Sequence, residues 1–285
     1  MLMSMAPMLQ DAREKRYAVV APGVNDLQTI EAVFQAADEM NAPIILDCVE
    51  MNDIEAVADI TEFMALRYPQ VDVALNLDHG KSFEVCAKAI QAGFTSVMID
   101  CSMLPFEENV AITAEVTKMA HAVGVSVEAE LGRVGSAQKY AEDRLSPFTD
   151  PVEAVEFVKR TSVDCLAVAV GTAHGLYKDE QPELAFDLIA ELRTVVPVPL
   201  VLHGASGTGD DEMARAVQAG ITKINLFSDL SLAGTRAVEE VLNSGMTTPL
   251  GFLPLSMVYG KGVAAYKKMV MHYIEVSGSK GAAVR

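Results

Sequence analysis

The sequence contains no tryptophan, and its aromatic residues amount to only 6% of the chain. Hydrophobic residues nevertheless make up 51%, so alanine, valine, isoleucine, leucine and methionine must form most of the core. No apolar run approaches the roughly 20 residues that a membrane-spanning helix needs. We therefore expect a globular protein with a large aliphatic core and no membrane partner.

Basic residues are also few. Lysine and arginine number 22 against 39 aspartate and glutamate residues, and the formal net charge is −17. Nucleic-acid binding requires clustered basic side chains, and the sequence has no such cluster, so we expect no nucleic-acid partner. The acidic balance does not exclude a phosphorylated small molecule, because backbone N–H groups at a helix N-terminus bind anions whatever the distant surface charge.

Cysteine is scarce, and none of the four cysteines forms a Cys-x-x-Cys pair. They lie in or next to apolar runs, which favours buried free thiols in a reducing compartment over disulfides. The four are Cys48, Cys86, Cys101 and Cys165. The first ten residues lack the basic start and the long apolar segment of a secretion signal. These observations predict a cytoplasmic protein.

Short apolar runs alternate with longer helical patterns along the chain, which is typical of repeated βα units. The expected strands are Tyr17–Ala21, Pro43–Asp47, Asp72–Leu77, Ser96–Ile99, Ser126–Leu131, Cys165–Ala169, Pro199–Leu202 and Lys223–Leu226. The expected helices are Leu27–Met40, Asp53–Arg67, Ser82–Ala92, Glu107–Val123, Pro151–Thr161, Glu183–Thr194, Asp210–Ala219 and Asp229–Ser244. Eight such units predict a (β/α)8 TIM barrel, in which strand C-terminal ends meet at one face.

The barrel is expected to span about residues 17–245, with a C-terminal extension over about 246–285 that includes a helix at Gly260–Val276. We expect residues 1–285 to form a single domain, because a TIM barrel of this length is one unit. The segment Gly132–Thr149 is long, polar and rich in glycine and serine. It predicts a mobile loop over the site.

Three of only five histidines follow expected strands and stand beside a glycine. They are His79, His174 and His203, at the ends of the third, sixth and seventh strands. Three imidazoles with an open fourth position suit a catalytic Zn²⁺ ion. For any one of them alone, a histidine satisfied by hydrogen bonds is the simpler interpretation. His121 and His272 lie in helical segments and are expected to be structural.

Carboxylates accompany these histidines at the strand ends. Asp78 directly precedes His79 and could transfer a proton, or it could orient a ligating imidazole. Glu128 and Glu130 share one face of the fifth strand by alternation, and Glu128 could equally form a structural ion pair inside the barrel. Asp100 follows the fourth strand and extends this ring of polar residues.

A glycine-rich loop connects the seventh strand to the next helix at residues 203–209. Small residues there expose backbone N–H groups where TIM barrels commonly bind phosphate. A glycine-rich loop alone can be a simple turn. Because His203 belongs to this loop, the segment predicts a metal ion and a phosphate group side by side.

Five motifs, in this order, resemble those of the class II (zinc-dependent) fructose- and tagatose-bisphosphate aldolases. They are Leu-Asp-His-Gly at 77–80, Val-Glu-Ala-Glu-Leu-Gly at 127–132, Ala-Val-Ala-Val-Gly-Thr-Ala-His-Gly at 167–175, Leu-Val-Leu-His-Gly-Ala-Ser-Gly at 200–207 and Lys-Ile-Asn at 223–225. The resemblance covers about residues 17–245. It implies a TIM barrel that cleaves a phosphorylated ketose to dihydroxyacetone phosphate and an aldehyde, with Zn²⁺ stabilising the enediolate.

Carried over by position, the resemblance implies that the three histidines bind Zn²⁺ and that Asp78 is the acid/base. It implies that Asp100 and Glu130 support the ligands or form an alternative metal position. It places around one substrate phosphate Gly175, Gly204, Ser206, Asn225 and Ser228. Backbone carbonyls near Gly175 and Gly204 are expected to hold Na⁺ or K⁺, and the chain is expected to form a homodimer or homotetramer.

The chain departs from the family where substrate is contacted. Ala-Pro-Gly at 21–23 replaces the family's Ala-Phe-Asn, and Val49 stands where a small hydroxyl residue is usual. Phe227 occupies the position that is Asp in fructose-type and Ala in tagatose-type members. A large ring in place of a carboxylate removes a charged contact and fills volume. We therefore expect Val49 and Phe227 to affect specificity, and expect fructose 1,6-bisphosphate not to be the preferred substrate.

A second departure follows Gly135, where residues 136–140 replace the family's acidic cluster. The acidic residues Glu142 and Asp143 lie further along the sequence. The residue that moves the donor-carbon proton is therefore open. Two alternatives accompany the aldolase hypothesis. One is a non-catalytic sugar-phosphate-binding subunit that keeps the metal site, and the other is a metal-dependent hydrolase on the same barrel.

Overall fold

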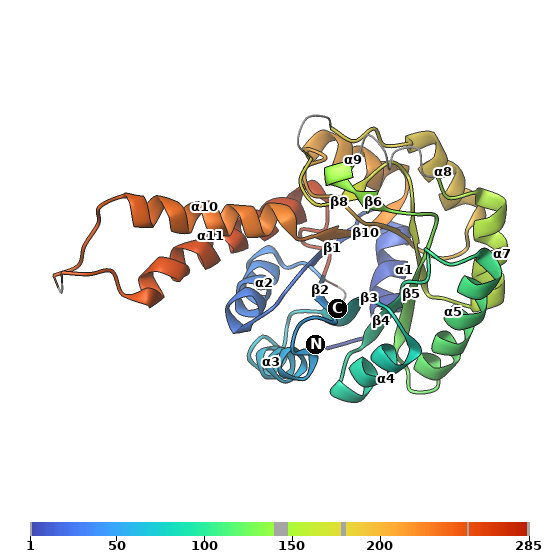
Figure 1. Ribbon diagram of the computed structural model, residues 1–285, viewed down its shortest axis with the longest axis horizontal. Coiled ribbons are helices and arrows are strands. Elements are labelled where there is room, and N and C mark those ends of the chain that lie inside the picture. The colour runs from blue at the N-terminus through green and yellow to red at the C-terminus, as the bar shows by residue number, and fades with distance from the viewer. Residues whose placement is uncertain (1, 140–147, 178–180, 250, 284–285) are drawn as a thin grey trace.

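Eight parallel strands with alternating helices form a nearly closed barrel (Figure 1). We describe it from a computed structural model over residues 2–139, 148–177, 181–249 and 251–283. The barrel strands are β1 (Val19–Pro22), β2 (Ile44–Val49), β3 (Val73–Gly80), β4 (Ser96–Ile99), β5 (Ser126–Leu131), β7 (Cys165–Val168), β9 (Leu200–Leu202) and β10 (Ile221–Leu226). They are hydrogen-bonded in the order β1-β10-β9-β7-β5-β4-β3-β2, and a bridge between Gly23 and Asp47 brings β1 beside β2. The predicted TIM barrel is confirmed.

The described helices surround this barrel. They are α1 (Met5–Lys15), α2 (Leu27–Met40), α3 (Ile54–Arg67), α4 (Phe83–Ala92), α5 (Phe106–His121), α7 (Pro151–Thr161), α8 (Phe186–Val195), α9 (Asp210–Ala219), α10 (Ser228–Asn243) and α11 (Leu255–Val276). Their ends follow capping chemistry: the Asp150 carboxylate accepts the backbone N–H groups of Val152 and Glu153, and Gly220 ends α9.

Helix α1 was not expected from the sequence. Its residues Met5, Met8, Leu9 and Ala12 are fully buried and pack with the inward-facing residues of the strands. The backbone N–H of Met5 donates to Ser96 Oγ at 3.1 Å, at the N-terminal start of β4. The helix therefore closes the N-terminal end of the barrel with apolar side chains.

Helices α10 and α11 form a hairpin that projects from the barrel, on the left of Figure 1. The two helices approach closely at Gly234 and Gly262, where an added Cβ at Gly234 would lie 3.2 Å from the Gly262 carbonyl oxygen. Helix α11 starts at Leu255 rather than at the expected Gly260, and it returns to pack on α2 and β1. Its Tyr266 hydroxyl donates to the Gly23 carbonyl at 2.7 Å.

The segment after β5 is described only in part. A short strand β6 (Gly135–Ser136) pairs in parallel with β8 (Ala173–His174), and a 3-10 turn, η1, covers Ala137–Lys139. The expected mobile loop, together with Glu142 and Asp143, lies outside the described residues in its central part, 140–147. All four cysteines are buried and free, as predicted. Among the described helices, none has both the length and the apolar character needed to cross a bilayer.

Candidate metal centre and substrate cavity

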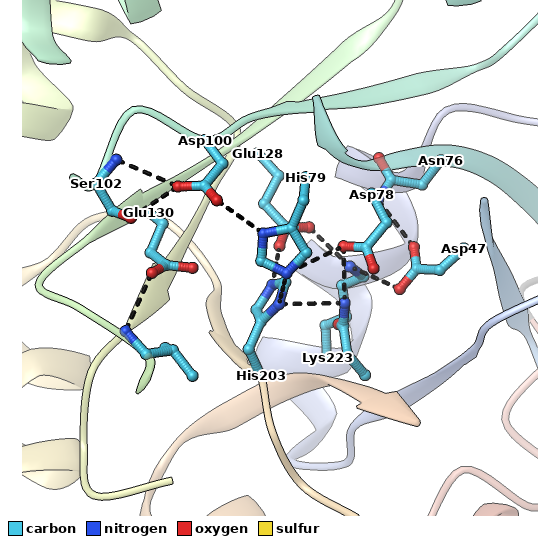
Figure 2. A network of polar contacts seen from close by, with 12 residues as sticks. Asp47, Asn76, Asp78, His79, Asp100, Ser102, Glu128, Glu130, His203 and Lys223 are labelled. Carbon is cyan, nitrogen blue, oxygen red and sulfur yellow. Dashed lines mark hydrogen bonds and ion pairs between the residues drawn. The ribbon is translucent and has the colours of Figure 1, made fainter. Parts of the chain in front are cut away.

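The three predicted histidines meet at the C-terminal mouth of the barrel. One ring nitrogen from each of His79, His174 and His203 lies within 4.8 Å of the others. His79 Nε2 and His203 Nδ1 are the closest pair, 3.1 Å apart (Figure 2). They reach this point from β3, β8 and the end of β9, so strands distant in the sequence build one centre.

The second nitrogen of two of these rings binds a carboxylate. His79 Nδ1 donates to Asp100 at 2.9 Å, and His203 Nε2 donates to Glu128 at 2.7 Å. With both rings neutral, the other nitrogen of each imidazole presents a lone pair, and these two nitrogens face each other at 3.1 Å. A proton shared between them or a bound cation satisfies both nitrogens. Carboxylate–histidine pairing of this kind orients metal ligands in proteins, so the residues fit a divalent ion.

The charges around the rings also favour a cation. Burial opposes protonation of His79, but Asp78 and Asp100 raise the pKa of His79 to about 9, so positive charge is stabilised there. Burial and the neighbouring His203 and His79 rings lower the pKa of His174 to about 3. His174 is therefore a neutral imidazole, the form that coordinates metal.

Asp78 and His79 are neighbours in β3, yet both side chains line the same cavity. The backbone of His79 adopts φ 51°, a left-handed conformation that breaks the strand's alternation. This places Asp78 Oδ1 3.9 Å from His79 Nε2, where it accepts a hydrogen bond from Asn225 Nδ2 at 3.2 Å. Asp78 and His79 therefore both reach the mouth of the barrel.

A buried ion network lies beneath the histidines, and the sequence analysis missed most of it. Lys223 Nζ is 2.8 Å from Glu128 and 3.3 Å from Asp47, and all three side chains are almost inaccessible to solvent. Asp47 also accepts from Asn76 at 2.8 Å. Burial lowers the pKa of Lys223, but Asp47 and Glu128 outweigh burial and raise it. Lys223 is therefore a fixed positive charge.

The same network sets the charge state of its carboxylates. Burial opposes ionisation of Glu128, but Lys223 and His203 hold its pKa at about 2. Burial raises the pKa of Asp47 to about 7, although Lys223 opposes the shift. Glu128 is thus an ionised acceptor for His203. The structural ion-pair alternative for Glu128 therefore describes its contact with Lys223, while its contact with His203 belongs to the metal centre.

Asp100 and Glu130 lie on the other side of His79, along a separate cavity of about 590 Å³. Burial opposes ionisation of Asp100, but hydrogen bonds from His79, Lys81 and Ser102 hold its pKa well below the usual range. Burial raises the pKa of Glu130, and Glu130 accepts the backbone N–H of Val134 at 3.2 Å. His79, Asp100 and Glu130 form a second group whose atoms could hold a metal ion.

The substrate cavity has a volume of about 390 Å³ and contains Asp78 and the three histidines on its wall. Each residue predicted to contact phosphate or substrate also lines it: Gly175, Gly204, Ser206, Asn225 and Ser228. So do Val49 and Phe227, the predicted specificity positions. The structure therefore brings together the two predicted groups, although they come from β2, β3, β8, β10 and the loops that follow β8 and β9.

The glycine-rich loop is held by α10 and α11. Asp229 accepts the backbone N–H of Gly207 at 2.8 Å and the hydroxyl of Tyr273, and its own backbone N–H donates to Ser206 Oγ at 3.3 Å. Gly204 adopts φ 64°, and a Cβ there would lie 2.5 Å from the Ala173 carbonyl. Glycine is needed at this position because the two loops that carry His174 and His203 touch through their backbones.

Tyr177, which the sequence analysis did not single out, also joins these two loops. Its hydroxyl accepts the backbone N–H of Ala173 at 2.7 Å and donates toward the carbonyls of Ala173 and Gly204, at 3.0 and 3.2 Å. Thr172 Oγ1 donates to the His203 carbonyl at 2.7 Å. His121 and His272, expected to be structural, are hydrogen-bonded at the surface to Asp164 and Asp210, at 2.8 and 2.9 Å.

Known proteins resemble this chain over its full length. A sequence profile described as fructose-bisphosphate aldolase class-II matches residues 3–282. The fructose-bisphosphate aldolase of Geobacillus stearothermophilus is 42% identical over 290 residues, covering 100% of this chain and 99% of that protein. A probable fructose-bisphosphate aldolase of Bacillus subtilis is 44% identical over 247 residues, covering 85% of this chain and 86% of that protein. The YdjI aldolase from Escherichia coli K12 superposes with a TM-score of 0.87 at 33% identity, with 100% of both chains covered.

Proposed function

Because this chain belongs to the class II fructose-bisphosphate aldolase family and is therefore an aldehyde-lyase, we propose that it reversibly cleaves a phosphorylated ketose to dihydroxyacetone phosphate and an aldehyde, using Zn²⁺. The observation that carries the proposal is the convergence of one ring nitrogen from each of His79, His174 and His203 within 4.8 Å of one another, beside Asp78. When bound, Zn²⁺ supplies Lewis-acid polarisation of the ketose carbonyl and its neighbouring hydroxyl. His79, His174 and His203 would hold it.

Asp78 is the proposed acid/base. In cleavage its carboxylate accepts the proton of the hydroxyl next to the breaking carbon–carbon bond, so that the aldehyde carbonyl forms and the bonding electrons stay on the dihydroxyacetone phosphate carbon. That carbon then takes up one proton, which balances the reaction. Asn225 donates to Asp78 and fixes its orientation. In synthesis Asp78 returns the proton to the aldehyde oxygen.

The backbone and hydroxyl groups of the glycine-rich loop are proposed to hold the phosphate. Gly204, Ser206 and Ser228 line the cavity beside the histidines, and Ser228 begins helix α10. The N-terminus of a helix attracts anions through its free N–H groups. A Na⁺ or K⁺ ion near Gly175 and Gly204, a homodimer or homotetramer and a cytoplasmic location stay predictions.

The Geobacillus stearothermophilus relative is named fructose-bisphosphate aldolase, and the Bacillus subtilis relative is named probable fructose-bisphosphate aldolase. The comparisons therefore give no support to the expectation that fructose 1,6-bisphosphate is not the preferred ketose, and they make it the first substrate to test. The departures at Gly23, Val49 and Phe227 favour the second candidate, a sugar-phosphate-binding subunit without activity. The presence of Asp78 next to the metal centre favours catalysis.

Replacing Asp78 tests the proposal. We expect Asp78→Ala to lower kcat/KM for cleavage by about 10³-fold, the middle of the range for a lost general acid/base, while zinc content measured by elemental analysis stays at one per chain. His203→Ala should lose the zinc as well, and His121→Ala, a surface histidine outside the site, should change neither property. Chelation should abolish activity and added Zn²⁺ should restore it. A lysine adduct trapped by borohydride, or no turnover of any phosphorylated ketose, would refute it.

A further inference from the structure

The substrate cavity has two chemically different walls. Asp78 and the three histidines form its polar part, and the apolar side chains of Val49, Met51 and Phe227 form an apolar wall beside them. The amides of Asn25 and Asn52 flank the apolar wall and are joined by a hydrogen bond of 2.8 Å. These groups can contact carbon atoms and uncharged hydroxyls of a bound sugar.

The ring of Phe227 can lie against residue 23 because residue 23 has no side chain. A Cβ built on Gly23 would lie 2.7 Å from Phe227 Cδ2, which is closer than real Cβ contacts allow. The backbone holds both residues in this position, since the Gly23 N–H donates to the Leu226 carbonyl at 2.9 Å and the Tyr266 hydroxyl donates to the Gly23 carbonyl. The observed position of the Phe227 ring thus depends on glycine at position 23.

Among the described residues, the apolar wall offers no cation to a second phosphate. Among the described residues that line this cavity, none is lysine or arginine, and Asp47 and Asp78 add negative charge. The cations Lys81 and Arg133 line the neighbouring cavity, which shares His79 and His174 with this one, and Lys81 is paired with Asp100 at 2.7 Å. Hydroxyl and backbone groups near Ser206 can hold one phosphate, but a phosphate against Phe227 would be desolvated without compensation.

From the proposed function and these contacts, we propose that Gly23 and Phe227 form a specificity pair that selects aldehydes without a phosphate group, such as a short hydroxyaldehyde. Phe227 contacts the carbon chain of the aldehyde, and Gly23 keeps the ring against that chain. The ketose formed would carry its only phosphate on the dihydroxyacetone half. Because this inference rests on the proposed function, its test must distinguish a failure of the inference from a failure of the proposed function.

The exchange of C3 hydrogen of dihydroxyacetone phosphate with solvent deuterium needs no aldehyde, so it measures the proposed aldolase chemistry alone. The synthesis reaction is then measured with glyceraldehyde and with glyceraldehyde 3-phosphate. We expect the zinc-loaded protein to exchange, and to favour glyceraldehyde by about tenfold in kcat/KM. Phe227→Ala should bring this ratio close to one, whereas Phe63→Ala should leave it unchanged, because Phe63 on α3 is as exposed as Phe227 (53% and 52%) and lies outside the cavity.

A double-mutant cycle tests the contact itself. Gly23→Ala should lower kcat/KM for glyceraldehyde by about tenfold when residue 227 is Phe, and by less than about twofold in combination with Phe227→Ala, because the clash is with the ring. Gly260→Ala, where an added Cβ meets nothing within 4 Å, is the control. Exchange together with a preference for glyceraldehyde 3-phosphate, or equal effects of Gly23→Ala in both backgrounds, would overturn the inference alone. No exchange would overturn the proposed function and the inference with it.

Discussion

The two ends of the barrel differ in chemistry, although the same eight strands build both. The N-terminal end is filled by Met5, Met8 and Leu9 of α1, which pack on apolar strand residues. The C-terminal end contains the buried ions Asp47, Glu128 and Lys223 beneath the histidines. Buried apolar groups stabilise a fold directly, whereas buried charges are neutral or destabilising unless each has its partner.

This difference separates stability from function within one molecule. Inside a TIM barrel, the chemistry lies at the C-terminal ends of the strands. There, Lys223 keeps Glu128 ionised, and Glu128 orients His203. Helix α1, by contrast, packs at the N-terminal ends of the strands. Changes at the apolar end should therefore alter the free energy of unfolding, and changes at the ionic end should alter both stability and metal binding.

Lys223→Met tests the ionic end of the barrel and should have the largest effect. The substitution removes the buried cation that Asp47 and Glu128 share, so we expect the free energy of unfolding to fall by about 3–5 kcal/mol. Zinc affinity should fall as well, because Glu128 no longer stays ionised to orient His203. Urea denaturation and metal titration measure the two effects. A loss below 1 kcal/mol would show that the ionic end does not depend on its pairing.

Leu9→Ala tests the apolar end. Leu9 is fully buried in α1, so we expect a loss of about 3 kcal/mol in the free energy of unfolding from lost transfer energy and the cavity left behind. The kcat of the zinc-loaded enzyme should be unchanged. Leu66→Ala, at a leucine that is 77% exposed on α3, should cost less than about 0.5 kcal/mol. A tenfold fall in kcat for Leu9→Ala would contradict the separation of the two ends.

Tyr273→Phe tests how the glycine-rich loop is supported at the ionic end, and its effect should be smaller than those above. It removes the hydroxyl that donates to Asp229, which holds the N–H of Gly207 in the glycine-rich loop. We expect KM for the phosphorylated ketose to rise about fivefold with little change in kcat, which corresponds to about 1 kcal/mol for one hydrogen bond. Tyr259→Phe, at an exposed tyrosine on the same helix, is the matched control. A change confined to kcat would assign Tyr273 another role.

The barrel was predictable because its signals are local. The strands Ser96–Ile99 and Ser126–Leu131 have the predicted bounds, and Leu27–Met40 and Pro151–Thr161 do as well. Apolar runs and capping residues determine such elements within a few positions. The start of α11 was missed because glycines at 260 and 262 interrupt the helical pattern. Gly262 serves packing against α10, where an added Cβ would lie 3.1 Å from the Gly234 carbonyl oxygen, and no local rule reports such a contact.

Helix α1 was missed although its signal was present. The apolar residues Met5, Met8, Leu9 and Ala12 follow the i, i+3, i+4, i+7 spacing of an amphipathic helix. The segment was tested only as a targeting signal, and its role in closing the barrel depends on the finished fold. The sequence alone could not show which surface this apolar stripe covers.

The site was predictable where its residues follow strand ends, as the three histidines and Asp78 do. The ion network was not, because Asp47 and Lys223 are 176 positions apart and meet only after β1 comes between β2 and β10. Phe227 was noted as a departure from the family, but its contact with Gly23 depends on the pairing of β1 with β10. Register, which the sequence does not display, decides such pairs.

Helix α11 supports the rims of the substrate cavity at two places. Its Tyr266 hydroxyl donates to the Gly23 carbonyl, and its Tyr273 hydroxyl donates to Asp229. During synthesis on the ribosome, the strands that carry the histidines emerge well before these tyrosines. A nascent chain can thus assemble its metal ligands while the cavity rims are still unsupported. The last described helix of the chain thus completes the support of the substrate cavity.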